Sequence, residues 1–138
     1  MPDTKQIILF IQAFRIGLKA QQIEKVSLTQ LISELTNSRW LPQNLAPADA
    51  HLAASRALRY LKRLGYRTSC IIECLIVGTL LSDQVGIRIH LGFRPLSGNG
   101  FEDADGHAWL SGACYPQDVN SESYQETTSL PIKRKHHV

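Results

Sequence analysis

The sequence predicts an α+β fold in which a helical N-terminal half packs on a small antiparallel sheet. Two observations predict this class: apolar residues recur at helical spacing before residue 65, and alternation of apolar and polar residues begins only after Gly86. The chain has 138 residues, of which 43% are hydrophobic and 20% charged. This composition fits one globular domain, which we divide into a helical subregion (1–46), a core (47–119) and a flexible tail (120–138).

Three helices are predicted in the first half. The first spans about residues 5–21, and the stripe that we expect to face the core consists of Ile7, Ile11, Phe14 and Leu18. The second follows Ser27, a typical N-cap residue, and ends near residue 35. After a linker with two prolines, a third helix begins at Pro47 and ends at Gly65. The expected core edge of this third helix consists of Leu58, Leu61 and Leu64.

The fourth predicted helix differs from the others. It runs from Cys70 to about Leu81 after a second candidate cap, Ser69, and it is apolar nearly all round. A helix without a polar face is normally buried. We therefore expect this helix at the centre of the molecule.

The sheet is predicted from the residues that follow. Gly86 precedes a half-buried strand whose apolar face consists of Ile87, Ile89, Leu91 and Phe93. A polar loop (94–106) leads to a returning strand at 107–110, with His107 and Trp109 on the same face. We expect a further turn or short strand at 115–119. Apolar periodicity is lost after Asn120, so no regular structure is expected there.

Composition restricts the possible functions and locations. The formal net charge is +3, which suits an anionic partner but is too small to indicate nucleic-acid binding. The longest apolar run, Ile7–Ile11, is far shorter than the roughly 18 residues of a membrane span, and no secretory signal is visible. Three cysteines do not complete a disulfide framework, so we expect a cytoplasmic protein. The common metal, nucleotide and serine-hydrolase motifs are absent, and we expect neither a metal nor a cofactor.

Three residues of the second half have the side chains of a nucleophilic triad. Cys70 begins a helix, where free backbone N–H groups favour an anion and can stabilise an oxyanion. His107 is the candidate base on a strand, and Asp118 follows at a distance that suits a neighbouring strand. The order Cys, His, Asp on helix, strand and strand is that of the transglutaminase and papain-like core. Cys74, one helical turn further, is a less suitable nucleophile because a thiol inside the helix lacks those N–H groups.

Residues around this triad resemble the leader peptidases of lasso-peptide biosynthesis, which are cysteine proteases with a transglutaminase-like core. The resemblance covers about residues 60–119. The matching elements are Cys70, the Leu80-Leu81 pair, Gly86 with Gly92, Phe101, and the tripeptide His107-Ala108-Trp109.

The resemblance implies a fold, an activity and partners. The chain would have a transglutaminase or papain-like core and would remove the leader from a ribosomally made precursor, freeing the amine for a separate macrocyclase. Cys70 would attack the scissile carbonyl, His107 would move the proton, and Asp118 would orient His107. Some relatives carry a fused leader-recognition domain that includes strands. Residues 1–50 do not alternate like strands, so a separate recognition protein is expected to present the leader peptide, with the macrocyclase as a further candidate partner.

Two other functions stay open on sequence grounds. A transglutaminase-like core could hydrolyse or transfer another amide. Alternatively, the chain could be a non-enzymatic helical adaptor that binds an acidic partner through a basic helix edge and a basic tail. His90, on the polar face of its strand, could approach the site, but we expect it to be an ordinary exposed strand residue.

Overall fold

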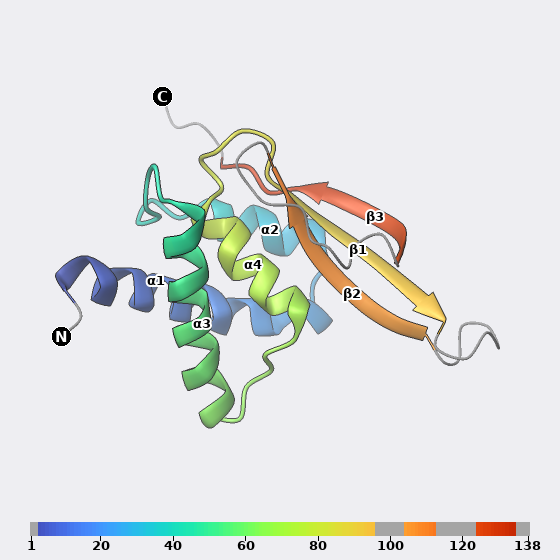
Figure 1. The fold of residues 1–138 in the computed structure, drawn as a ribbon, viewed down its shortest axis with the longest axis horizontal. Coiled ribbons are helices and arrows are strands. Elements are labelled where there is room, and N and C mark those ends of the chain that lie inside the picture. Colours follow the sequence, from blue (N-terminus) through green and yellow to red (C-terminus); the bar gives the residue numbers. More distant parts are fainter. Residues whose placement is uncertain (1–2, 96–103, 113–123, 135–138) are drawn as a thin grey trace.

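The computed structural model describes residues 3–95, 104–112 and 124–134. In these residues it is an α+β fold, as predicted, with four α-helices and one antiparallel sheet of three strands (Figure 1). The helices are α1 (Thr4–Ala20), a short 3-10 helix η1 (Gln21–Glu24), α2 (Leu28–Thr36), α3 (Pro47–Arg63) and α4 (Cys70–Leu80). The strands are β1 (Arg88–Pro95), β2 (Ala104–Ser111) and β3 (Gln125–Pro131).

The predicted helix boundaries are confirmed because local signals set them. The Ser27 hydroxyl accepts a hydrogen bond from the backbone N–H of Gln30 at 3.1 Å, and Pro47 occupies the first turn of α3. Just after α3, Gly65 has φ +87°, a left-handed conformation that ends a helix. Ser69 is the N-cap of α4, but its side chain makes no capping hydrogen bond.

The face that α1 turns to the core is the predicted one only in part, since Phe14 packs against the core but the first two residues of the stripe do not. Ile7 and Ile11 are 47% and 50% exposed, whereas the buried residues of α1 are Leu9, Ala13, Ile16, Gly17 and Ala20. An ideal Cβ on Gly17 would lie 2.5 Å from the Leu61 Cδ1 atom, so α1 crosses α3 too closely for a larger side chain. Small residues at this crossing therefore let α1 approach α3, with Leu9 and Ile16 as the large buried side chains of α1. The prediction for Leu64 is also wrong, since it is 63% exposed beyond the end of α3.

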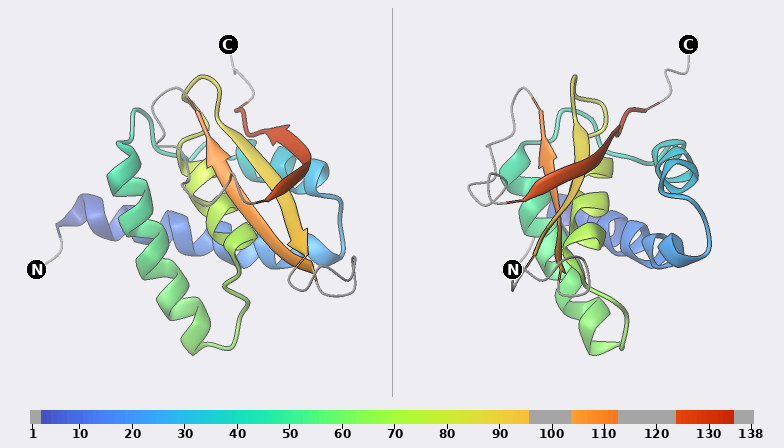
Figure 2. Two further views of the ribbon diagram at one scale, coloured as in Figure 1. Left: turned by 45° about the vertical axis from the view of Figure 1, so that its right-hand side comes forward. Right: turned by 90° about the vertical axis from the view of Figure 1, so that its right-hand side faces the viewer.

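Helix α4 lies at the centre of the molecule, as expected. It contacts α1 and α3 on one side and β1 and β2 on the other (Figures 1 and 2). Every residue from Cys74 to Leu80 is buried. Helix α1 of the N-terminal subregion packs directly on α3 and α4.

The sheet has the order β2-β1-β3, with both neighbours antiparallel to the central strand. Ile89 of β1 is fully buried and is paired with Leu110 of β2 and Leu130 of β3. The strands extend into the predicted loop at both ends, since β1 reaches Pro95 and β2 begins at Ala104. The strand or turn expected at 115–119 lies outside the described residues.

The third strand corrects the prediction of a flexible tail from residue 120. Residues 125–131 form β3, although the segment QETTSLP has no apolar alternation. It is an edge strand whose first four residues are exposed, so its backbone pairing with β1 holds it in place. Because backbone pairing does not require alternating apolar residues, the sequence pattern did not predict this strand.

Residues after β3 are bound to the central helix. Ile132 is 1% exposed and lies over Gly78 of α4. The Arg134 guanidinium donates hydrogen bonds to the Leu80 carbonyl oxygen at 3.0 Å and to Ser82 Oγ at 2.7 Å. Burial lowers the pKa of Arg134, and the Asp83 carboxylate opposes this effect. Arg134 thus supplies donors to carbonyl groups at the C-terminal end of α4, which lack partners within the helix.

Candidate active site

Cys70 is the first residue of α4 and is partly exposed. The segment that leads to it is fixed by Gln21, whose side-chain amide makes two hydrogen bonds with the backbone of Arg67. Its Nε2 donates to the Arg67 carbonyl at 2.9 Å, and its Oε1 accepts from the Arg67 N–H at 3.0 Å. The thiol therefore lies at a defined helix N-terminus, the position at which backbone N–H groups are open to an anion.

The Cys70 thiol lies against strand β2. The backbone N–H of Ala108 donates a hydrogen bond to Cys70 Sγ at 3.4 Å. Ala108 is 38 residues further along the chain and directly follows His107. The structure thus brings the candidate nucleophile beside the strand that carries the candidate base.

The His107 side chain is on the sheet face opposite to the core. Because α4 packs on the core face, the structure does not bring the imidazole and the Cys70 thiol to the same face of β2. Ala108 and Leu110 are buried, and His107 and Trp109 alternate with them, as predicted. The His107 ring stacks on Trp109, with centroids 5.7 Å apart, and on Tyr124, with centroids 4.7 Å apart. Aromatic rings therefore pack against two sides of the imidazole.

The other predicted site residues have different positions. Asp118 and Cys114 lie outside the described residues. Cys74 is 8% exposed and belongs to the hydrophobic core, one turn along α4 from Cys70. This burial agrees with our preference for Cys70 as the nucleophile.

The prediction for His90 is wrong. Its side chain is 17% exposed, with Nδ1 against the Glu126 carboxylate and Nε2 2.6 Å from the Ser111 hydroxyl oxygen. Its ring also stacks on Trp109 at 5.5 Å. The sequence reading missed this cluster because Glu126 belongs to β3, the strand that has no apolar pattern. The one available signal was the period-two alternation, which puts His90 on the polar face of β1.

A pocket of about 670 Å³ lies near the other end of α4, between residues 82–88 and the segments 38–44 and 131–134. An α-helix rises about 1.5 Å per residue, so the length of α4 is about 16 Å and separates this pocket from Cys70. The pocket is therefore not part of the thiol site.

The described part of the chain contains neither a cluster of metal-binding side chains nor a membrane-spanning helix. It holds no group of three or more His, Cys, Asp or Glu side chains arranged to bind a metal ion. It also holds no helix with the length and apolar character of a membrane span.

Comparison with known proteins gives no match: no family model fits the chain, no curated protein is significantly similar in sequence, and no solved structure is significantly similar in fold.

Proposed function

We propose that this chain is a cysteine peptidase that removes the leader peptide from a lasso-peptide precursor. The observation that carries the proposal is the 3.4 Å hydrogen bond between the Ala108 N–H and Cys70 Sγ. A thiol at a helix N-terminus, with a backbone N–H group against its sulfur, has donors that favour the thiolate. Proton transfer to His107 additionally requires the imidazole to reach the thiol from the other face of β2. The α+β class and the central position of α4 agree with a transglutaminase-like core, which is part of the proposal.

The proposed reaction has two steps. Cys70 Sγ attacks the scissile carbonyl carbon, and His107 accepts the thiol proton and passes it to the amine that leaves. A thioester then joins Cys70 to the leader peptide. Water, deprotonated by His107, hydrolyses this thioester and restores the thiol. Asp118 orients the imidazole of His107, and the N–H groups at the start of α4 stabilise the oxyanion.

The proposal includes partners. The substrate is the leader part of a precursor peptide, presented by a separate recognition protein through strand addition. The released amine is the substrate of a macrocyclase. These partners follow from the resemblance of residues 60–119 to lasso-peptide leader peptidases.

The test is mass spectrometry of the precursor after incubation with this protein and the recognition protein. We expect Cys70→Ala and His107→Ala to reduce cleavage by about 10³-fold or more, because each removes a group that takes part in bond making. Asp118→Ala is expected to have a smaller effect, since it changes only the orientation of His107. Cys74→Ala is the matched control and should keep its activity.

Each other outcome identifies a different function. A Cys70→Ala variant that still cleaves would rule out the proposed mechanism. No cleavage, together with a Cys70 thiol whose alkylation depends on His107, would favour another amide hydrolase or acyl transferase. A Cys70 thiol that does not react near neutral pH would favour the non-enzymatic adaptor.

A further inference from the structure

Four rings form a continuous stack on the outer face of the sheet. His90 and Trp109 are nearly parallel, with an angle of 9° and centroids 5.5 Å apart. Trp109 and His107 follow at 19° and 5.7 Å, and Tyr124 packs on both, with centroids 4.7 Å from His107 and 6.4 Å from Trp109. Trp109 therefore lies between two imidazoles, one of which is the proposed base.

The end of the stack furthest from His107 is held by hydrogen bonds. Both ring nitrogens of His90 have partners, the Glu126 carboxylate on β3 and the Ser111 hydroxyl on β2. A rotation of the His90 ring would break both bonds. The orientation of His90 is thus fixed from both neighbouring strands, and its ring provides a fixed surface for Trp109.

The sheet also leaves space for the Trp109 ring. Gly92 of β1 is the cross-strand partner of His107, and an ideal Cβ on Gly92 would lie 3.0 Å from Trp109 Cη2. The same Cβ would lie 2.7 Å from the Gln125 carbonyl oxygen. Because position 92 has no side chain, the indole can lie close to β1, beside the residue pair that includes His107.

We propose that Trp109, held by His90, is a positioning residue for His107. This inference rests on the proposed function, because it assumes that His107 is the base for Cys70 and reaches it around β2, an edge strand of the sheet. Trp109 acts through His107 and does not touch the substrate. Its flat face limits the rotation of the imidazole, and this effect is separate from the orienting role proposed for Asp118. A base that is displaced by about 1 Å can lose on the order of a hundredfold in rate.

The test measures the rate of Cys70 alkylation by iodoacetamide at pH 7, with mass spectrometry to assign the label to Cys70. Trp109→Leu removes the flat face, and we expect alkylation to slow by about tenfold, toward the rate of His107→Ala. Trp109→Phe keeps a flat ring and is expected to stay within about threefold of the wild-type rate. Only a role in orientation predicts this difference between Leu and Phe.

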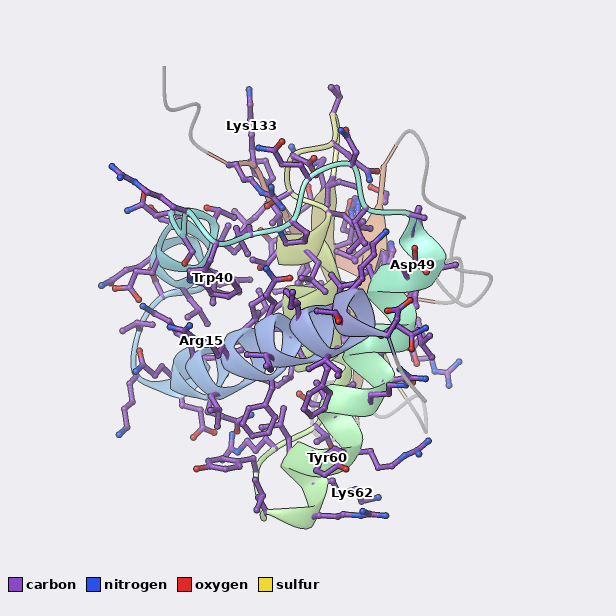
Figure 3. The ribbon with its side chains drawn as sticks, turned by 90° about the vertical axis from the view of Figure 1, so that its left-hand side faces the viewer. Arg15, Trp40, Asp49, Tyr60, Lys62 and Lys133 are labelled. Atoms are coloured by element: carbon purple, nitrogen blue, oxygen red, sulfur yellow. The ribbon has the colours of Figure 1, made fainter. Side chains whose placement is uncertain are left out.

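The chain has a matched control in its other tryptophan. Trp40 lies on the helical side of the molecule, where the Arg15 guanidinium is 5.1 Å from its ring (Figure 3). Trp40→Leu should leave the Cys70 rate unchanged. Should Trp109→Leu fail to fold, His90→Gln provides a second variant, because it removes the ring that holds Trp109. We expect about threefold slower alkylation for His90→Gln in a folded protein.

The results separate this inference from the proposed function. Slow alkylation in His107→Ala and normal alkylation in folded Trp109→Leu or His90→Gln would overturn the positioning role and leave the dyad intact. Normal alkylation in His107→Ala would overturn the dyad and, with it, the positioning role. Slow alkylation in Trp109→Leu that Trp109→Phe restores would support both.

Discussion

The packing of Ile132 on Gly78 predicts a strong coupling between two substitutions. An ideal Cβ on Gly78 would lie 2.5 Å from Ile132 Cδ1 and 3.3 Å from Leu110 Cδ2. Ile132 is 1% exposed, so its side chain has little room to move away. A methyl group at position 78 and the Cδ1 atom of Ile132 therefore compete for the same space.

The expected free energies follow from this geometry. Ile132→Ala removes buried methyl and methylene groups and leaves a cavity, which costs about 3 kcal/mol of stability. Gly78→Ala gains about 1 kcal/mol of helix propensity but overpacks the contact by about 2 kcal/mol, a net loss of about 1 kcal/mol. In the double variant the clash is absent and the new methyl fills part of the cavity. We expect a total loss of about 2 kcal/mol, against about 4 kcal/mol if the two effects were additive.

Urea denaturation of the wild type, both single variants and the double variant measures this coupling. Trp fluorescence and circular dichroism should give the same transition midpoint for each protein. A coupling of about 2 kcal/mol corresponds to a factor of about 30 in the folding equilibrium. Additivity within about 0.5 kcal/mol would refute the close packing of residue 132 on α4.

Three further predictions concern single positions. Gly65→Ala should destabilise the fold by about 1 kcal/mol, because φ is +87° there. Gly106→Ala, a control inside β2 with equally open space, should stabilise the fold by up to about 1 kcal/mol in the same urea titration. Arg134→Met should lower the free energy of unfolding by about 3 kcal/mol, since it removes the guanidinium hydrogen bonds to the Leu80 carbonyl and to Ser82 Oγ; a loss below about 1 kcal/mol would contradict this role. Gln21→Ala removes both side-chain hydrogen bonds to Arg67, and hydrogen exchange of the Arg67 amide should accelerate by about tenfold, whereas an unchanged rate would show that this segment is held by other contacts.

Local signals made the helix boundaries predictable. Ser27, Pro47 and Gly65 act within one or two turns of the chain, so their effect can be inferred from neighbouring residues alone. The buried face of α1 could not be inferred in this way. It depends on how closely α3 approaches, and Gly17 allows an approach that the larger residues on the opposite face would prevent.

The sheet and the site were also predictable only where a local pattern determines the structure. Alternation in β1 and β2 gave the correct faces for His107 and Trp109. The third strand has no alternation, and its pairing with β1 is a long-range property of the backbone. Because β3 was not predicted, there was no reason in the sequence to pair Glu126 with His90. The fixed orientation of His90, and its stacking on Trp109, could therefore not be predicted.

The hydrogen bonds of Arg134 also have a consequence for synthesis. Fifty-four residues separate Leu80 from the guanidinium that binds its carbonyl oxygen. At about 5–20 residues per second, a ribosome needs about 3–11 s to add that stretch. During this interval α4, the most apolar of the described helices, exists without the guanidinium donors of Arg134 and without Ile132 over Gly78. For several seconds the nascent chain therefore exposes the side of α4 that later packs on the sheet. This apolar surface is where we expect a chaperone to bind during synthesis.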